Sequence, residues 1–503
     1  MKKSTDKRVA HFPVLRTIMR VLVTMLAGVI VALLAGFILF LNNQSNLSVW
    51  HTTVLDVEFT TDSPVKNFKD YLSLEDRLFA QLDEKVYAHI RPEERNTINR
   101  YNSGSLSDPA RWPTNWNRSF EFTVPKPVAG VLLLHGLSDS PYSLRRLGQK
   151  LSASGVHVLG LRIPGHGTAP SGLVNVKWED MAGAVRLSMG YLKKQLGDIP
   201  LYMVGYSNGG ALTVQYILST LENASLPRAS GVVLISPEIG VAKVAAFAVW
   251  QGRIGRLLGL PKLAWNSVLP EYDPFKYNSF AVNAGDQAYR LTTEIQNQIT
   301  KNTKSGVLSQ LPPIMAFQSV VDATVRVPAL IEGLFDRLPQ GDHELVLFDI
   351  NRNAAIMSKF LVDDPGPLTN RLMADQDLPF AITFVTNEDP HSTRVVVRHK
   401  PPFSAETTIT ESLDLDWPRG VVSLSHVALP FPPNDPIYGR YPPEDDDQVF
   451  LGDLAIKGER GVLKIPGNWL LRLRYNPFYT YMQTRVLQWL NDAGTRVANP
   501  DPG

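Results

Sequence analysis

Ser207 is the residue whose type and spacing point most directly to chemistry. It stands at the centre of a Gly-Tyr-Ser-Asn-Gly motif at residues 205–209, between an apolar run at residues 201–205 and a helical pattern. A serine on so sharp a turn between strand and helix has strained backbone angles, and Gly205 and Gly209 let the two elements pass close together. The turn exposes the hydroxyl at a helix N-terminus, whose free N–H groups favour an oxyanion. We predict that Ser207 is a nucleophile, the alternative being a serine that marks an ordinary turn.

A nucleophilic serine at such a turn needs a general base, and the expected order along the chain is serine, acid, histidine. Of the ten histidines, four come late enough in the chain: His343, His391, His399 and His426. His426 follows a short apolar run at residues 420–424, which we predict to be a strand with His426 in the loop at its C-terminal end. Binding loops gather at that end of parallel strands. We assign the base to His426 and keep the other three histidines as alternatives.

The orienting acid should follow a strand, and Asp322 comes just after the apolar run at residues 313–317. Asp322 must be buried beside His426, because its carboxylate has to fix the tautomer of the imidazole and stabilise the imidazolium. Asp336 falls on the outer part of the next helix instead. Asp322 could also cap the helix that opens near Thr324, and the two roles are compatible.

A tetrahedral intermediate needs two N–H donors for its oxyanion. We expect one from the amide of Asn208, directly after the nucleophile, and the other from the amide of Leu137, in the loop that follows the apolar run at residues 130–134. His135 helps to turn the chain in that loop and is predicted to be structural. His166 lies between two glycines in a further turn, but nothing around it has the spacing of metal ligands.

The elements that must position these residues form an alternating pattern. Each of six apolar runs is about five or six residues long, as expected for strands covered on both faces: residues 130–134, 156–161, 201–205, 231–235, 313–317 and 344–348. Between these runs, apolar residues recur at helical spacing, for example at residues 178–192 and 214–221. The alternation predicts an α/β fold with a mostly parallel, doubly wound sheet.

Two long stretches interrupt this alternation. Residues 239–311 separate two strands by about 70 positions, which is too long for a bare loop and predicts a cap over the site. Within it, the apolar and basic stretch at residues 241–265 could roof a pocket or lie against an anionic bilayer surface. Residues 351–419 form a second insertion, with a β-hairpin predicted from residues 381–386 and 394–398.

An uncharged apolar run at residues 21–41 is long enough, as a helix, to cross the roughly 30 Å hydrocarbon layer of a membrane. Six basic residues and a single acidic one precede it, so the positive-inside rule places the N-terminus in the cytoplasm and the rest of the chain across the membrane. A bacterial inner membrane with a periplasm-facing domain is the expected location. The alternative is a cleaved signal peptide, whose apolar region would be shorter and followed by small residues.

Composition narrows the function classes. The chain has 503 residues, 44% hydrophobic and 9% aromatic, with 50 basic and 48 acidic side chains, so it is neither disordered nor an obvious nucleic-acid binder. Cysteine is absent, which excludes disulfides, thiol nucleophiles and cysteine-ligated metals. We divide the chain into a cytoplasmic basic tail (1–20), a transmembrane signal-anchor helix (21–41), a stalk and N-terminal approach (42–115), the core (116–238, 312–350 and 420–497), the cap insertion (239–311) and the second insertion (351–419).

The motifs HGLSDSPYS, RIPGHGT, GYSNGG, the DATV after the next strand and the late SH resemble the serine hydrolases of the α/β-hydrolase fold. The nearest branch contains monoacylglycerol lipases, lysophospholipases and carboxylesterases. The resemblance covers residues 118–238, 312–350 and 420–495, and it implies Ser207 as nucleophile, His426 as base, Asp322 as acid, and Leu137 and Asn208 as oxyanion donors. It also implies that no metal or cofactor is used. The interval of about 100 residues between acid and histidine is longer than in compact relatives.

The sequence therefore predicts a membrane-anchored serine hydrolase that cleaves lipid-like carboxylic esters through an acyl-enzyme intermediate. An amidase or peptidase with the same three side chains is one alternative, and a non-catalytic binding protein on the same scaffold is another. The expected partners are a small or lipid-like ester and the membrane, without nucleic acid. The sequence leaves the oligomeric state open.

Overall fold

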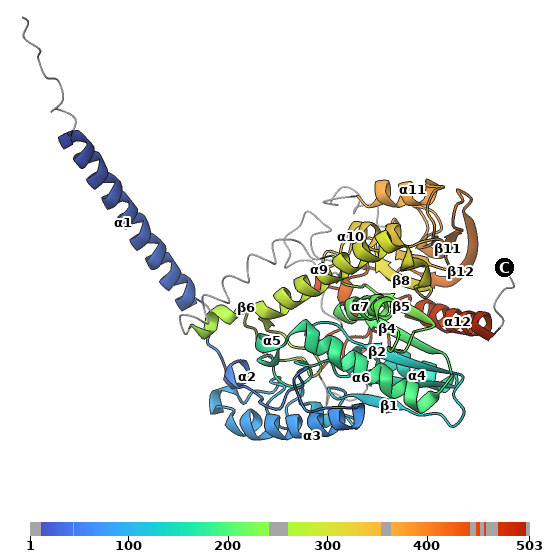
Figure 1. The fold of residues 1–503 in the computed structure, drawn as a ribbon, viewed down its shortest axis with the longest axis horizontal. Helices are drawn as coiled ribbons and strands as arrows, with labels where there is room; N and C mark the ends of the chain where they lie inside the picture. Colours follow the sequence, from blue (N-terminus) through green and yellow to red (C-terminus); the bar gives the residue numbers. More distant parts are fainter. Residues whose placement is uncertain are drawn as a thin grey trace, which may run out of the picture.

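The computed structural model describes residues 12–43, 45–240, 260–353, 364–442, 449–452, 457–458 and 471–498. Its centre is a ten-stranded sheet of order β1-β3-β2-β4-β5-β8-β9-β10-β11-β12 (Figure 1). The strands are β1 Phe120–Phe122, β2 Ala129–Leu134, β3 Val156–Leu161, β4 Leu201–Tyr206, β5 Gly231–Ile235, β8 Ile314–Ser319, β9 Glu344–Phe348, β10 Ala381–Asn387, β11 Arg394–Lys400 and β12 Thr408–Asp416. All six strands predicted from apolar runs are present within a residue or two of their predicted bounds.

The seven strands from β3 to β10 in this order pair in parallel, whereas β1, β11 and β12 pair antiparallel at the two edges. The predicted α/β fold with a mostly parallel sheet is therefore confirmed. The parallel strands are apolar throughout because both of their faces are covered. In β2, for example, Val131 and Leu133 belong to one hydrophobic core and Leu132 and Leu134 to the other.

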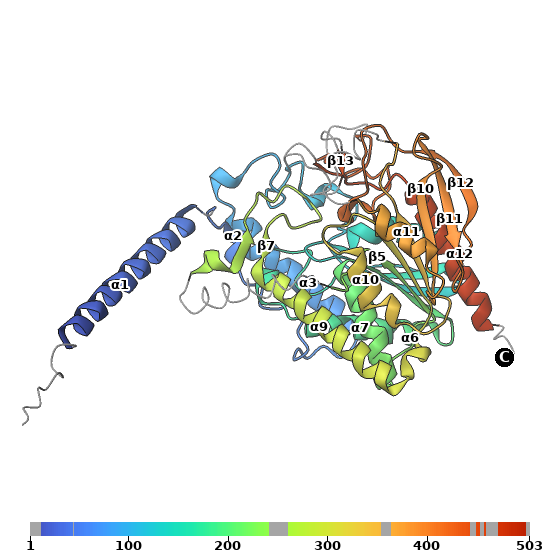
Figure 2. The same cartoon turned by 90° about the horizontal axis from the view of Figure 1, so that it is seen from above.

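Helices cover both faces of the sheet. Helices α4 Arg145–Ala153 and α12 Tyr479–Ala498 pack on one face, and α6 Trp178–Leu196, α7 Asn208–Glu222, α9 Val282–Ser305 and α10 Val327–Gly333 pack on the other. In the view from above, α6, α7 and α9 lie together (Figure 2). The shorter elements are α5 Gly172–Asn175, α11 Gly366–Ala374 and two small sheets, β6 Trp265–Ser267 with β7 Phe280–Ala281, and β13 Lys457–Gly458 with β14 Leu471–Arg472. This arrangement places the carboxyl ends of the parallel strands at one edge of the sheet.

The N-terminal helix α1, Phe12–Asn43, projects from the body of the protein (Figure 1). It contains the apolar run at residues 21–41. In the part of the chain that the structure describes, no helix is long and apolar enough to cross a membrane, so the predicted anchor gains no support from the structure.

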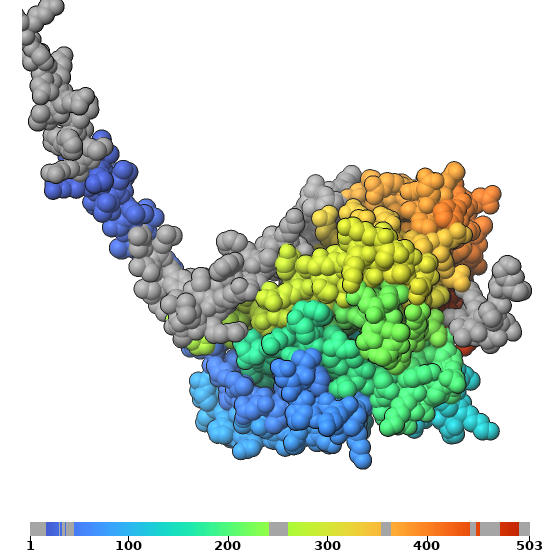
Figure 3. Space-filling view, viewed as in Figure 1, coloured from blue at the N-terminus to red at the C-terminus, as the bar shows by residue number. Residues whose placement is uncertain are grey.

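Residues 45–115, part of the segment predicted as a stalk and N-terminal approach to the core, contact the core through α3 (Phe68–Lys85) and the residues before it. Helices α2 Val49–Thr52 and α3 Phe68–Lys85 belong to this segment, which lies flat against the core (Figure 3). The guanidinium of Arg162, after β3, donates two hydrogen bonds to Glu58, at 2.9 and 3.0 Å, and one to Glu75 of α3 at 3.1 Å. Arg162 is fully buried, so this ion-pair network ties the segment to the core.

The two insertions differ in how far they match their predictions. The predicted hairpin is present as β10 and β11, but it extends the main sheet, because β10 pairs in parallel with β9 and β11 leads on to β12. Apolar alternation identifies such strands but does not reveal which sheet edge they join. In the cap insertion, α9 packs beside α7 and α5. Residues 241–259, most of the apolar and basic stretch, lie outside the described residues.

Candidate active site

Ser207 lies on a strained turn between β4 and α7. Its backbone angles are φ 54° and ψ −118°, in a region that residues other than glycine rarely adopt. A Cβ added to Gly205 would lie 2.4 Å from the carbonyl oxygen of Gly209, and a Cβ added to Gly209 would lie 2.1 Å from the carbonyl oxygen of Leu134. Both positions must therefore be glycine for steric reasons, as the sequence analysis proposed for this turn.

Two further serines with positive φ lie at the same edge of the sheet. Ser138 (φ 59°) lies in the loop after β2, and Ser236 (φ 42°) follows β5. Because β2, β4 and β5 are neighbours in the sheet, the three strained residues gather around one location. Strain of this kind costs about 1–3 kcal/mol per residue and is concentrated at functional sites in proteins.

Ser207, His426 and Asp322 form a continuous hydrogen-bonded relay. The Oγ of Ser207 lies 3.0 Å from Nε2 of His426, and Nδ1 of His426 lies 2.8 Å from Oδ2 of Asp322. All three residues are buried, with 7%, 4% and 4% exposure. If Nδ1 carries its proton toward the carboxylate, Nε2 has a free lone pair for the proton of the serine. The structure thus brings together the three residues that the sequence placed in this constellation.

The two oxygens of the Asp322 carboxylate have different partners, one set in the following turn and one in the relay. Oδ1 accepts hydrogen bonds from the backbone amides of Thr324 and Val325, at 2.8 and 2.9 Å. Oδ2 faces His426 and also accepts a 2.9 Å hydrogen bond from the side-chain amide of Gln318. The turn-capping role and the orienting role considered from the sequence therefore coexist in one side chain.

His426 reaches the site from a segment that is not a regular strand. The apolar run at residues 420–424 was predicted as a strand, but it forms isolated bridges instead of a regular strand, one of them between Ser423 and Ile350. An apolar run is expected of a buried loop as well as of a short buried strand, so the sequence pattern does not distinguish the two. Asn351 holds the segment by donating from its backbone amide to Val422 at 2.7 Å and from its side chain to Val421 at 3.1 Å.

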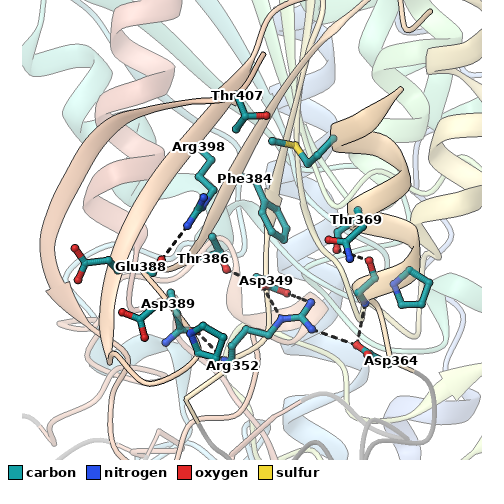
Figure 4. A pocket seen from close by; sticks show the side chains of 16 residues that line it. Asp349, Arg352, Asp364, Thr369, Phe384, Thr386, Glu388, Asp389, Arg398 and Thr407 are labelled. Carbon is teal, nitrogen blue, oxygen red and sulfur yellow. Dashed lines mark hydrogen bonds and ion pairs between the residues drawn. The ribbon is translucent and has the colours of Figure 1, made fainter. Parts of the chain in front are cut away.

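The loop that carries Asn351 is fixed by charges beside it. Figure 4 shows Arg352 between Asp349 and Asp364, with Thr386 directed at Asp349. Arg352 donates to both oxygens of Asp349, at 2.8 and 2.9 Å, and to Asp364 at 3.2 Å. These residues line a cavity of about 730 Å³ between α11 and the strands β10 and β11. None of the predicted site residues lines this cavity.

The two predicted oxyanion donors flank Ser207. Asn208 begins α7 directly after the nucleophile, and Leu137 lies in the loop after β2. A Cβ added to Gly136 would lie 3.2 Å from the Cβ of Ser207, which shows how closely this loop approaches the nucleophile. Among the described residues, neither the Leu137 nor the Asn208 amide has an intramolecular acceptor. Both N–H groups are therefore available to a bound oxyanion.

His135 fixes the loop that carries Leu137. Its Nδ1 donates to the carbonyl of Gly136 at 2.9 Å, and its Nε2 accepts from the amide of Ile163 at 3.1 Å. Burial lowers the pKa of His135 well below its usual value, and neighbouring His166 lowers it further, so the ring is neutral. These contacts match the structural role that the sequence predicted for it.

The alternative histidines have other partners. His343 is buried, its Nδ1 accepts from the amide of Ile314 at 3.2 Å, and burial lowers its pKa to about 4. His399 lies on β11 against Thr383, at 3.0 Å, and His391 lies in the exposed turn between β10 and β11. None of the three is bonded to Ser207. In the described ranges, no group of three or more His, Asp or Glu side chains could hold a metal ion.

One acidic residue at the site, Glu238, was not predicted from the sequence. Glu238 follows β5, and its backbone amide donates to the carbonyl of Ser207 at 3.0 Å. Burial raises the pKa of its carboxyl to about 7, with His426 lowering it and Asp322 raising it by smaller amounts. The one available signal was its position, because Glu238, like Ser207 and Asp322, follows a parallel strand at the carboxyl edge of the sheet.

The fold and this geometry define a class of protein: an α/β-hydrolase domain with a serine–histidine–aspartate constellation. Residues 125–350 match the model of the family described as serine aminopeptidase, S33 (Hydrolase_4). This region of the chain is therefore similar to that family, in keeping with the resemblance of its motifs. The match ends before the segment that carries His426.

Two curated relatives and a solved structure illustrate the similarity. The thermostable monoacylglycerol lipase of Bacillus sp. (strain H-257) is 30% identical over 137 residues, which is 27% of this chain and 52% of the lipase. Phospholipase YtpA of Bacillus subtilis (strain 168) is 24% identical over 146 residues, 29% of this chain and 51% of that protein. The chain thus spans about half the length of these relatives. The Paleococcus ferrophilus monoacylglycerol lipase structure is 18% identical, with a TM-score of 0.35, covering 46% of this chain and 88% of that one.

Proposed function

We propose that this protein is a serine hydrolase that cleaves carboxylic esters with a lipid-like acyl group. The observation that carries the proposal is the relay from Ser207 Oγ through the His426 ring to Asp322, with links of 3.0 and 2.8 Å. Such a relay is the means by which a serine hydroxyl becomes nucleophilic near neutral pH.

The chemistry follows from these groups in two steps. In the first, Ser207 Oγ attacks the ester carbonyl while His426 Nε2 takes its proton, and Asp322 stabilises the imidazolium. The oxyanion lies between the amides of Asn208 and Leu137. The intermediate collapses to an acyl-enzyme as His426 gives its proton to the leaving alcohol. In the second step, His426 removes a proton from water, which attacks the acyl-enzyme, and His426 then returns the proton to Ser207 Oγ as the acid leaves.

The substrate class is proposed from the relatives. One similar protein bears the name monoacylglycerol lipase and another the name phospholipase, which supports an acyl ester of a glycerol-based lipid. The description of the family as a serine aminopeptidase supports a second candidate, an amidase or peptidase with the same side chains. Esters are easier to cleave than amides because the alcohol is the better leaving group.

A location at a membrane is also proposed. The apolar run at residues 21–41 and the basic residues before it support it, with the catalytic domain on the side opposite the N-terminus. In the described part of α1 the large apolar side chains from Ile18 to Val31 are about half exposed or more, so they would face lipid rather than the protein. Fractionation of cells expressing the full chain should place it with the membranes. Recovery of the intact protein in the soluble fraction would contradict this proposal.

Matched substrates test the reaction class. The full chain in detergent should hydrolyse a monoacylglycerol, a lysophospholipid and p-nitrophenyl esters, and should cleave the corresponding amides far more slowly. Ser207→Ala should lose this activity, whereas the exposed Ser154→Ala should keep it. Faster cleavage of the amide than of the ester would favour a peptidase. Turnover by Ser207→Ala equal to that of the wild type would show that Ser207 is not the nucleophile.

A further inference from the structure

A charged side chain of the cap insertion reaches the donor loop, residues 135–140, which carries the proposed oxyanion donor Leu137. Lys276 lies between β6 and β7, and its Nζ is 3.4 Å from Oδ2 of Asp139, two residues after Leu137. The Asp139 side chain is 3% exposed and that of Lys276 is 18% exposed, so water largely does not reach the pair. A buried ion pair adds little net stability, because desolvation of the charges offsets their attraction. What this pair does fix is the position of the donor loop relative to the cap insertion.

The backbone beside the ion pair joins the same two segments. The amide of Tyr277 donates to the carbonyl of Ser138 at 2.8 Å. Ser138 has a φ of 59°, a conformation that a residue with a side chain keeps only when its surroundings hold it there. Tyr277 is itself anchored, since its hydroxyl accepts from the amide of Thr168 at 2.8 Å. Two successive residues of the cap insertion therefore hold two successive residues of the donor loop, directly after the proposed oxyanion donor.

Lys276 also contacts the segments that carry the nucleophile and the base. Its Nζ lies 4.8 Å from the ring centroid of Phe431 and 5.4 Å from that of Tyr438, both in the segment that follows the catalytic histidine. It lies 6.0 Å from the ring centroid of Tyr206, the residue directly before the nucleophile. A cation at these distances is attracted by the negative face of an aromatic ring. One ammonium group therefore contacts the three segments that supply the nucleophile, the base and an oxyanion donor.

The backbone of Lys276 is fixed without help from its side chain. Oδ1 of Asp273 accepts from the amides of Phe275 and Lys276, at 3.0 and 3.1 Å. Both oxygens of Asp273 also lie 2.7 Å from the hydroxyl of Tyr438. The ring of Phe275 stacks on that of Tyr142, with the centroids 4.2 Å apart. Removal of the ammonium group should therefore leave this turn of the cap insertion in place.

We propose, resting on the proposed function, that Lys276 is a positioning residue: its ion pair with Asp139 holds the Leu137 amide in place for the oxyanion of the tetrahedral intermediate. Lys276 touches no reacting atom and acts through Asp139 and the donor loop. No bond forms or breaks at either charge. The cap insertion thereby takes part in forming the oxyanion site.

Loss of the ion pair should weaken binding of the transition state and leave binding of the substrate unchanged. The oxyanion exists only once Ser207 has attacked, so a displaced Leu137 amide lowers kcat and leaves KM nearly unchanged. Removal of an oxyanion donor costs about 10²–10³-fold in kcat, and displacement of a donor that is still present should cost less. We therefore expect Lys276→Met to lower kcat about 10- to 100-fold and to change KM by less than about twofold.

Hydrolysis of a p-nitrophenyl ester by the full chain tests this. Burial raises the pKa of Asp139 to about 6, so the rates are measured at pH 8, where its carboxyl is ionised. Lys276→Met and Asp139→Asn should lose kcat to a similar extent, and the double variant should be no slower than the slower of the two, because the pair acts as a unit. Lys276→Arg should recover most of the rate. Lys304→Met, an exposed control at the end of α9 in the same insertion, should match the wild type.

Two inhibitors separate positioning from general damage to the site. A trifluoromethyl ketone adds to the nucleophile and forms an oxyanion, as the transition state does, whereas an ether analogue of the ester binds without addition. Lys276→Met should weaken inhibition by the ketone by the same factor as it lowers kcat/KM, and should leave inhibition by the ether unchanged. Equal weakening of both inhibitors, or of neither, would overturn the positioning role.

The outcomes keep the two proposals distinct. A decrease in kcat of less than about tenfold in Lys276→Met overturns its role, while ester hydrolysis by the wild type still supports the proposed function. A folded wild type that hydrolyses no ester overturns both. If a single variant fails to fold because it leaves one buried charge unpaired, the double variant decides, since it removes both charges. Wild-type kcat in the double variant would overturn the role, and a lower kcat at unchanged KM would support it.

Discussion

Replacing Asp322 by asparagine changes one atom in the relay and leaves the fold in place. Oδ1 accepts two backbone amides, from Thr324 and Val325, so the asparagine oxygen must take that position. The NH₂ group then takes the position of Oδ2, 2.8 Å from Nδ1 of His426 and 2.9 Å from the amide nitrogen of Gln318. The imidazole must shift its proton to Nε2 to avoid facing one donor with another, and Nε2 can then no longer accept the proton of Ser207.

The expected loss of activity in Asp322→Asn comes from the wrong tautomer of His426. Loss of the correct tautomer costs about 10⁴-fold in kcat, equivalent to about 5 kcal/mol of transition-state stabilisation. The unfavourable contact with Gln318 should cost only about 1–3 kcal/mol in the free energy of unfolding. Asp322→Asn should therefore fold and be almost inactive, whereas Asp322→Ala should be inactive and also lose the two hydrogen bonds at the turn.

The assay is hydrolysis of a p-nitrophenyl ester together with urea unfolding. Asp336→Asn serves as the matched control, because Asp336 is exposed and lies after α10, away from the relay. The control should keep wild-type kcat and stability. Retention of more than about a tenth of wild-type kcat by folded Asp322→Asn would refute the reasoning, because it would mean that His426 works without this carboxylate.

Two further predictions concern stability. Gly209→Ala should lower the free energy of unfolding by about 3 kcal/mol or more, because the added Cβ would lie 2.1 Å from the Leu134 oxygen and overlap backbone atoms. Gly190→Ala is the control, because its added Cβ has nothing within 4 Å. In urea unfolding it should be neutral or stabilising by under about 1 kcal/mol. Burial lowers the pKa of His343 to about 4, so His343 is neutral in the folded protein near neutral pH. Between about pH 6.5 and 4 the unfolded chain therefore binds more protons than the folded chain. The stability due to the neutral form is lost as the pH falls through that window. The difference in unfolding free energy between wild type and His343→Asn should shrink by about 3 kcal/mol from pH 7.5 to pH 4, and a constant difference would contradict a buried neutral His343.

The parts of the site that the sequence predicts are those set by local sterics. The glycines on either side of Ser207 and the apolar strand before it are sufficient to predict the turn, and the structure has it. Asp322 was predictable because it directly follows an apolar run, as residues at a strand's carboxyl end do. Their catalytic roles are proposals that the experiments above test.

Other parts depend on contacts between distant segments. The run at residues 420–424 is mostly buried and apolar, yet it forms isolated bridges such as Ser423–Ile350 and not a regular strand. No local pattern distinguishes a buried strand from a buried loop. Residues 351–419 carry strands β10 to β12 on the main sheet, which explains the long interval between Asp322 and His426. Glu238 has no motif around it, and its environment arises only when β4, β5 and β8 lie side by side.

Covalent labelling located by mass spectrometry tests the central claim most directly. Incubation of the full chain with a fluorophosphonate should add one probe per molecule, and peptide mapping should find it on Ser207. Ser207→Ala should remain unlabelled, and His426→Ala should be labelled at least a thousandfold more slowly, in line with about 4 kcal/mol of lost activation. A folded wild-type protein that takes up no probe, or carries it on another residue, would contradict the account.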